Sequence, residues 1–197
     1  ISFAMTLNTM LFGDGTGNGG KDWLGLKALV ENGAAWSTLG SINSDTWSFW
    51  RNVWKGTVGS FATAGMSNVR TAFNDVTRGR QRPNLIISDQ DGYEAYERLL
   101  VNQLNITDVE KPGDTGFRML RYKGVPWGFD DDCTAGFIYI LNTMFIKLNF
   151  GRGREMAMSD TMTPPDQDVK MTRALMYGQM TVNCRKMNAL VDGVTYP

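Results

Sequence analysis

Residues 15–22 read GTGNGGKD, a glycine-rich stretch whose spacing could bind phosphate. From Gly15 to Lys21 the spacing is that of the Walker A loop G-x-x-x-x-G-K-[ST], apart from the last position, which is Asp22. A Walker A loop follows a buried strand and opens a helix, so that its amides surround the phosphates. Here a helical pattern precedes the glycines, and Asp22 would place a negative charge at the magnesium position. The segment LIISD could supply a Walker B carboxylate at Asp89, so nucleotide hydrolysis stays as one alternative.

The same loop also resembles part of a calcium-binding EF-hand loop. Its positions 1, 3, 5, 6 and 9 would be Asp14, Thr16, Asn18, Gly19 and Asp22. The twelfth position needs a bidentate Glu, but it is Gly25. Because that missing carboxylate removes most of the affinity, the sequence does not predict a calcium site. The favoured interpretation is a flexible linker between two structural units.

Two charged clusters could also do chemistry. Three carboxylates stand in succession at residues 130–132. General acid/base catalysis needs two carboxylates at a fixed separation in a cleft, which the sequence does not indicate, so we expect a turn. The second feature is basic, with arginines at 78, 80 and 82 and again at 152 and 154. These arginines could neutralise nucleic-acid phosphate, pair with Asp or Glu on a neighbouring subunit, or face water.

Composition removes several classes of function. The 197 residues contain 20 Lys and Arg against 20 Asp and Glu, so net charge does not steer the chain to nucleic acid or an anionic membrane. Histidine is absent, which excludes Ser-His-Asp and Cys-His catalysis and His-ligated zinc. We predict no catalytic residue, cofactor or metal. No apolar run approaches the ~18 residues of a membrane span, and no signal peptide is visible. Cys133 and Cys184 could form a disulfide, but two buried thiols are favoured.

Helical patterns dominate the first half of the chain. Apolar spacing predicts a helix over residues 3–12, which Gly13 ends as a C-terminal cap. The spacing of Trp47, Trp50 and Trp54 predicts one helical face that serves as core or subunit contact, with a cofactor box as the alternative.

The clearest amphipathic helix is predicted between Phe61 and Val76. Its apolar face would consist of Ala62, Met66, Val69, Phe73 and Val76. The segment NLIIS then predicts a short buried strand, and Ser88 with Asp91 forms a capping-box pattern that opens another helix.

Strand patterns follow residue 112. Four segments read as strands, namely FRMLRYKG, VPWGFD, FIYILN and FIKLNF. Residues 151–168 predict a polar loop, and residues 176–185 predict one long strand. Its buried face would hold Met176, Gly178, Met180, Val182 and Cys184. Helices first and strands later indicate an α+β fold.

The order of these segments resembles that of major capsid proteins of tailed bacteriophages. The resemblance runs from residue 3 to residue 194. It is carried by LFGDGTG, GLKALV, DTWSFWRN, RPNLIISDQDGYEAYERLL, YKGVPWGFDDDC, YILNTMFIKL and MYGQMTVNCRKMNALV. It implies an α+β, Hong Kong 97-like capsid fold, with a peripheral domain (spine helix plus β-hairpin) and an axial domain (central sheet flanked by helices).

The resemblance also implies a division of the chain. Residues 1–20 would be the end of the spine helix and the hinge of the peripheral domain, and 21–143 the axial domain. Residues 144–181 would form the peripheral β-hairpin and loop, and 182–197 the return strand into the axial domain. In that hinge we expect Gly13 and Gly15 to take positive φ, so that valine at either position impairs folding or assembly. The family's N-terminal arm and extended loop are missing from this sequence, so we expect a fragment or processed product.

The function implied by the resemblance is structural, not enzymatic. A major capsid protein self-assembles into the icosahedral head shell that encloses phage double-stranded DNA. Its expected partners are copies of itself in hexamers and pentamers, portal, scaffold or decoration proteins, and DNA packaged without sequence specificity. The expected location is the virion, after assembly in the bacterial host cytoplasm, with no membrane partner. The alternatives are an encapsulin-like or prophage-derived protein shell and, from another class, a P-loop-like nucleotide hydrolase using Gly15 to Lys21.

Overall fold

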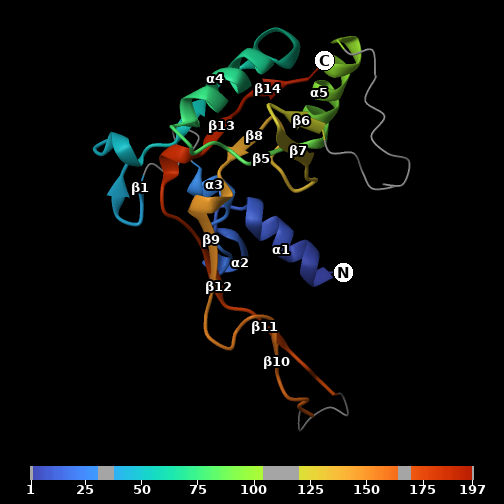
Figure 1. Ribbon diagram of the computed structural model, residues 1–197. Helices are drawn as coiled ribbons and strands as arrows, with labels where there is room; N and C mark the ends of the chain where they lie inside the picture. The colour runs from blue at the N-terminus through green and yellow to red at the C-terminus, as the bar shows by residue number, and fades with distance from the viewer. Residues whose placement is uncertain (1, 31–37, 104–119, 164–169, 197) are drawn as a thin grey trace.

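The computed structural model describes residues 2–30, 38–103, 120–163 and 170–196 of the chain. At its centre lies a mixed six-stranded sheet in the order β3-β13-β8-β5-β7-β6 (Figure 1). The strands are β3 Val53–Lys55, β5 Leu85–Ser88, β6 Leu120–Tyr122, β7 Val125–Phe129, β8 Ile138–Leu141 and β13 Ala189–Val191. Strands β3, β13, β5 and β7 run in one direction, and β8 and β6 run in the other. The mixture of this sheet with several helices confirms the α+β fold class.

Helices cover one face of the sheet (Figure 1). They are α4 Met66–Val76, which continues the π-helical turn η2 Phe61–Gly65, and α5 Gln90–Gln103. Val69, Phe73 and Val76 of α4 are buried, and each contributes about 1.5–3 kcal/mol of apolar stabilisation. Both predicted helices are therefore confirmed, although Ala62 is exposed and does not belong to the apolar face.

The opposite face of the sheet packs on helices α1 Ser2–Phe12 and α3 Leu26–Leu29. Strand β8 shows how one segment serves both faces. Ile138 and Ile140 pack in the cluster under α4 and α5, whereas Tyr139 and Leu141 pack in the cluster with α1 and α3. Successive side chains of a strand point to opposite faces, so a strand covered on both sides must be apolar throughout.

A long two-stranded hairpin extends from this body (Figure 1). Its proximal part pairs β9 Ile146–Phe150 with β12 Gly178–Val182, and its distal part pairs β10 Ala157–Met158 with β11 Ala174–Leu175. Met180 and Val182 pack into the cluster around α3, whereas Asn149 donates to Thr181 Oγ1 on the other face at 2.8 Å. The hairpin is thus anchored by one apolar face near the sheet.

The remaining elements are short. They are α2 Gly17–Gly20, β1 Thr38–Leu39, β2 Ile42–Asn43, η1 Ser48–Trp50, β4 Gly59–Ser60, η3 Thr143–Phe145, η4 Arg185–Met187 and β14 Val194–Thr195. Strands β1 and β2 pair with each other, and β14 pairs with β4.

Three predicted elements differ from the structure. Trp47, Trp50 and Trp54 do not share a helical face, because a 3-10 turn ends at Trp50 and β3 begins at Val53. The expected polar loop contains β10, because its backbone pairs with β11. The expected strand over residues 176–185 is limited to β12, Gly178–Val182, and η4 begins three residues later at Arg185. The first three residues of FRMLRYKG, as well as 164–168 of the polar segment, lie outside the described residues.

Candidate assembly surface

The glycine-rich loop is built as a connection between helices. Helix α1 leads into it, and after Lys21 the chain passes through irregular backbone to α3. Asp14 Oδ1 accepts hydrogen bonds from Thr16 N at 3.1 Å and Thr16 Oγ1 at 2.6 Å, and Lys27 Nζ lies 3.8 Å from its other oxygen. These contacts lower the pKa of Asp14, with the Thr16 hydroxyl as the largest cause. A phosphate-binding loop of the Walker A kind would instead be preceded by a buried strand.

At two glycines in this region the surrounding atoms leave no room for a side chain. Gly15 has φ +81°, and a Cβ there would stand 2.9 Å from Leu24 Cδ2. A Cβ on Gly25 would collide with the carbonyl oxygens of Met10, Leu11 and Gly13 at the end of α1. The expected positive φ is thus found at Gly15 but not at Gly13, whose N–H donates to Met10 O at 3.2 Å.

Asp89, the proposed Walker B residue, is buried and fully engaged. Its carboxylate accepts hydrogen bonds from Gly92 N at 3.2 Å, Gly136 N at 2.9 Å and the Tyr196 hydroxyl at 3.0 Å. Asp89 therefore caps α5, one residue later than the predicted Ser88. The Ser88 hydroxyl instead accepts a bond from Trp127 Nε1 at 2.9 Å.

The acidic run at 130–132 forms the predicted turn after β7 and also holds α1. Asn8 Nδ2 donates to Asp130 Oδ1 at 2.7 Å and to Asp132 Oδ2 at 2.8 Å. Thr9 Oγ1 donates to Asp132 Oδ1 at 3.3 Å. The sequence did not indicate this contact, because the partners lie more than a hundred residues apart. Among the residues that the structure describes, the donors to these two carboxylates are uncharged groups.

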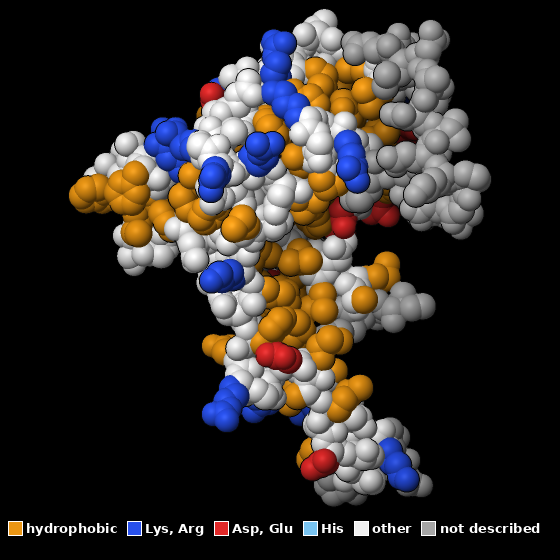
Figure 2. Space-filling model, viewed as in Figure 1, with side chains coloured by type: hydrophobic (Ala, Val, Ile, Leu, Met, Phe, Trp, Pro, Cys, Tyr) orange, Lys and Arg blue, Asp and Glu red, His pale blue; other side chains and the backbone are white. Residues whose placement is uncertain are grey.

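A small arm carries two exposed aromatic rings. It comprises β1, β2 and the turn through η1, that is, residues 38–50. Asn43 shapes the turn, because its side chain accepts from Asp45 N at 2.7 Å and its carbonyl accepts from Trp47 N at 2.9 Å. Trp47 and Phe49 are 55% and 59% exposed, and their ring centroids are 6.0 Å apart. The arm lies at the left of Figure 1, where β1 is labelled, and Figure 2 shows hydrophobic side chains gathered at that side of the molecule.

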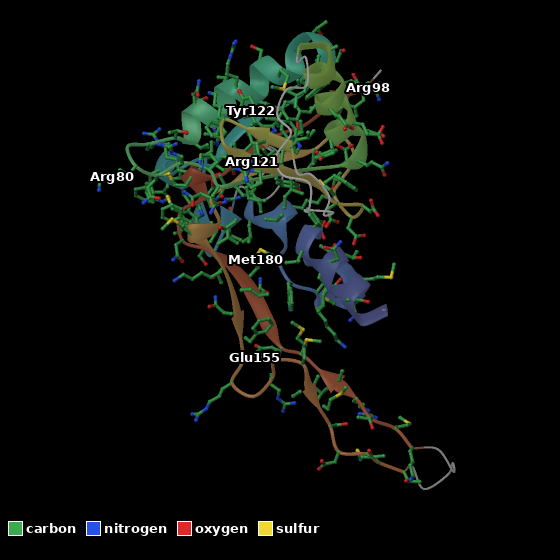
Figure 3. The ribbon with its side chains drawn as sticks, turned by 45° about the vertical axis from the view of Figure 1, so that its right-hand side comes forward. Arg80, Arg98, Arg121, Tyr122, Glu155 and Met180 are labelled. Atoms are coloured by element: carbon green, nitrogen blue, oxygen red, sulfur yellow. The ribbon has the colours of Figure 1, made fainter. Side chains whose placement is uncertain are left out.

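The five arginines singled out in the sequence are all exposed but form two separate groups. Arg78, Arg80 and Arg82 lie on the turn between α4 and β5. Arg152 and Arg154 lie on the hairpin. Figure 3 shows this separation, with Arg80 at one side of the upper body and Glu155 far along the hairpin.

The distal hairpin exposes several methionines. Met156, Met158 and Met162 are largely open to solvent, as is Tyr177. Met162 pairs with Met171 through two backbone hydrogen bonds of 2.9 and 2.8 Å. An isolated two-stranded ribbon buries little surface of its own, so these apolar side chains are available to another surface.

Arg185 is the buried group that the sequence analysis missed. Its side chain is fully buried, and it donates to Leu29 O at 2.9 Å and to Ala28 O at 3.4 Å. It thereby ties α3 to the chain entering β13. The expectation of a continuous strand had placed Arg185 opposite the buried face.

The cysteines are free thiols, as favoured from the sequence. Cys133 is buried, and Cys184 is half-buried. Burial, with smaller contributions from Asp89 and Asp130, raises the pKa of Cys133 to about 12. Among the described residues, no group of acidic and cysteine side chains has the arrangement of a metal site. No helix in the described parts is long and apolar enough to cross a membrane.

This arrangement of a mixed sheet, covering helices and a long hairpin is a phage capsid fold. The chain is similar to a chain in a solved structure described as the cyanophage A-1(L) capsid asymmetric unit, with a TM-score of 0.69 and 17% sequence identity. The alignment covers 98% of this chain and 69% of that chain. No protein-family model matches the sequence, and the search of curated proteins gave no match. At this identity the likeness establishes the fold alone.

Proposed function

We propose that the protein is the structural major capsid protein of a tailed bacteriophage, self-assembling into an icosahedral head that encloses double-stranded DNA. The observation that carries this proposal is the capsid likeness over 98% of the chain. Exposed rings on the arm and exposed methionines on the hairpin support it, because they offer apolar surface at two distant places.

The division into domains belongs to this proposal. Residues 1–20 and 144–181 would form the peripheral domain, and residues 21–143 with 182–197 the axial domain. The pairing of β9 with β12 and the place of β13 inside the large sheet support it. Gly15 then lies in the hinge, where its positive φ turns the chain from α1 towards α3.

The partners would be copies of this chain in hexamers and pentamers, together with portal, scaffold or decoration proteins. The packaged DNA would be held without sequence specificity. The protein would assemble in the bacterial host cytoplasm and end in the virion. An encapsulin-like or prophage-derived shell has the same fold and would differ in its contents.

Electron microscopy of the purified full-length product tests the proposal. We expect discrete hollow particles or capsomer rings, and nuclease-resistant DNA in particles from infected cells. Particles that enclose protein and no DNA would favour the encapsulin-like shell. A uniform monomer at high concentration would contradict both shells.

The nucleotide-hydrolase alternative has less support in the geometry. Asp89 is occupied by three donors, and the glycine loop is entered from a helix. Calorimetric titration with ATP and magnesium decides this point. Micromolar binding that disappears in Lys21→Ala would favour the nucleotide hydrolase and overturn the capsid assignment.

A further inference from the structure

The two ends of the six-stranded sheet carry charges of opposite sign. Strands β5 and β7 are parallel, so the residues that follow them lie at the same end. Asp91 follows β5, and the acidic run 130–132 follows β7. At the opposite end, the turn that enters β5 carries Arg78, Arg80 and Arg82.

The aromatic arm lies at the arginine end. Strand β3 runs in the same direction as β5, because β3 is parallel to β13 and both β13 and β5 are antiparallel to β8. The arm leads directly into the start of β3, as the arginine turn leads into the start of β5. We call Trp47, Phe49, Arg78, Arg80 and Arg82 the basic end. Figure 3 shows Arg80 on the side of the upper body opposite Arg98 of α5.

The other end combines acidic groups with an exposed ring. Phe129, the last residue of β7, is 46% exposed and lies against Tyr93, with ring centroids 5.2 Å apart. We call Asp91, Phe129, Asp130, Asp131 and Asp132 the acidic end. Figure 2 shows acidic side chains at the lower right of the upper body, across the molecule from the hydrophobic tip on the left.

The charges at both ends are available to a partner. The three arginines of the basic end form no ion pair with any residue that the structure describes. Within the same described parts, Asp91 and Asp131 also lack an ion pair and are exposed. Each end thus joins unpaired charges of one sign to exposed aromatic surface, a combination typical of interface anchors.

We propose that the basic end of one copy docks against the acidic end of the next copy, head to tail. This inference rests on the proposed function and specifies which surfaces join. The charges are complementary, and the rings of Trp47 and Phe49 would pack near Phe129 in the partner. Because one end meets the other, the contact is heterologous and generates rings or open chains.

A second copy accounts for more of the surface than nucleic acid does. Nucleic acid would account for the arginines but would be repelled by the acidic end. The whole chain has zero formal net charge, so identical copies can associate without accumulating charge. The two complementary ends therefore select a copy of this chain as the partner.

Sedimentation velocity of the full chain over a concentration series tests the contact. The basic-end variant is Arg80→Glu with Arg82→Glu, and the acidic-end variant is Asp91→Arg with Asp131→Arg. The control is Lys21→Glu with Arg70→Glu, which reverses two exposed positive charges outside both ends and outside the hairpin. We expect wild type and control to self-associate alike and each end variant to raise the apparent Kd at least about tenfold.

An equimolar mixture of the two end variants should recover association, because the unaltered basic end of one variant then meets the unaltered acidic end of the other, while the two reversed ends pair Glu with Arg. Circular dichroism confirms that each variant is folded. A second variant, Trp47→Ala with Phe49→Ala, changes no charge and should also weaken association, which keeps the test valid if a reversal fails to fold.

The outcomes separate this inference from the proposed function. If wild type associates and the end variants associate equally well, or if the mixture stays dissociated, the contact is wrong and the shell proposal stands. If wild type stays monomeric at every concentration, both are overturned. If the basic-end variant loses only binding to double-stranded DNA, the arginines serve nucleic acid and the contact is again wrong.

Discussion

Cys133 and Arg185 are both buried, but burial has opposite consequences for them. A thiol can stay neutral, and its surroundings raise the pKa of Cys133 to about 12. A guanidinium stays charged at any accessible pH, so Arg185 must donate hydrogen bonds inside the protein. The carbonyls of Ala28 and Leu29 accept them. The Cys133 thiol is therefore unreactive, whereas Arg185 holds α3 to the chain entering β13.

The thiol of Cys133 should not react with a disulfide reagent at pH 8 while the chain is folded. A variant with Cys184→Ser isolates its signal, and the same variant in urea provides the control for full reactivity. Rapid labelling of the folded variant would contradict the burial of this thiol.

The same shift predicts how stability depends on pH. Between the ordinary thiol pKa of 9.0 and about 12, the unfolded chain loses a proton that the folded chain retains. The free energy of unfolding should therefore be intact below pH 9 and fall as the pH rises above it. Burial also raises the pKa of Tyr96 and of Tyr139, which acts in the same direction. Urea unfolding measured at several alkaline pH values checks this slope.

Replacing Arg185 by Ala should destabilise the fold by about 2–4 kcal/mol, because two buried carbonyls lose their donor and a cavity is left. Urea unfolding gives the value. The neighbouring change Lys186→Ala is the control, and we expect it to stay within about 0.5 kcal/mol of wild type. Equal effects of both changes would show that the Arg185 hydrogen bonds add no stability.

At the scale of elements, the close approach of α1 and α3 depends on glycine. The carbonyls at the end of α1 occupy the space beside Gly25 where a side chain would begin. The loop between them turns at Gly15 through a left-handed conformation. Asn8 and Thr9 add polar contacts from α1 to the acidic turn. Helix α1 is thus fixed at both its flank and its end.

Gly15→Val should therefore cost about 1–3 kcal/mol, because it combines positive φ with a contact to Leu24. Gly19→Ala measures the cost of positive φ without a steric clash, since Gly19 has φ +69° with open space around it. Gly13→Val should be milder than Gly15→Val, because φ at Gly13 is not positive. Thermal unfolding orders the three variants. A larger loss at Gly13 than at Gly15 would contradict the hinge geometry.

Local sequence patterns predicted the elements whose stabilising contacts are regularly spaced. Helix α4 follows from the spacing of Val69, Phe73 and Val76, and β8 from a run of apolar residues. The tryptophan pattern failed because β3 is fixed by pairing with β13, more than 130 residues later, which local spacing cannot show. Arg185 was misplaced for a similar reason, since the 3-10 turn η4 rotates the chain after Val182.

The candidate surface was only partly visible in the sequence. The arginines, the acidic run and the tryptophans were all noticed as groups. Their distribution over two ends of one sheet depends on strand directions, which no local pattern contains. The capsid resemblance supplied the fold, because it used the order of many segments at once.

At the scale of the whole molecule, the proposed contact between opposite charges should make self-association sensitive to salt. Screening acts within about 10 Å at 0.1 M ionic strength, so contacts between exposed charges weaken as salt rises. Raising sodium chloride from about 0.05 M to about 0.5 M should weaken association of wild type several-fold. The acidic-end variant should show a smaller dependence. Light scattering at a fixed protein concentration measures both, and stronger wild-type association at high salt would contradict the ionic contact.

The proposed head-to-tail contact also restricts the number of copies that a ring of mixed variants can contain. In a mixture of the two reversed variants, favourable neighbours must alternate around any ring. A ring in which the two variants alternate can close only with an even number of copies. A ring with an odd number would contain one unfavourable contact between two copies of the same variant. A lattice that needs odd rings to curve in two directions would then flatten into sheets or roll into tubes.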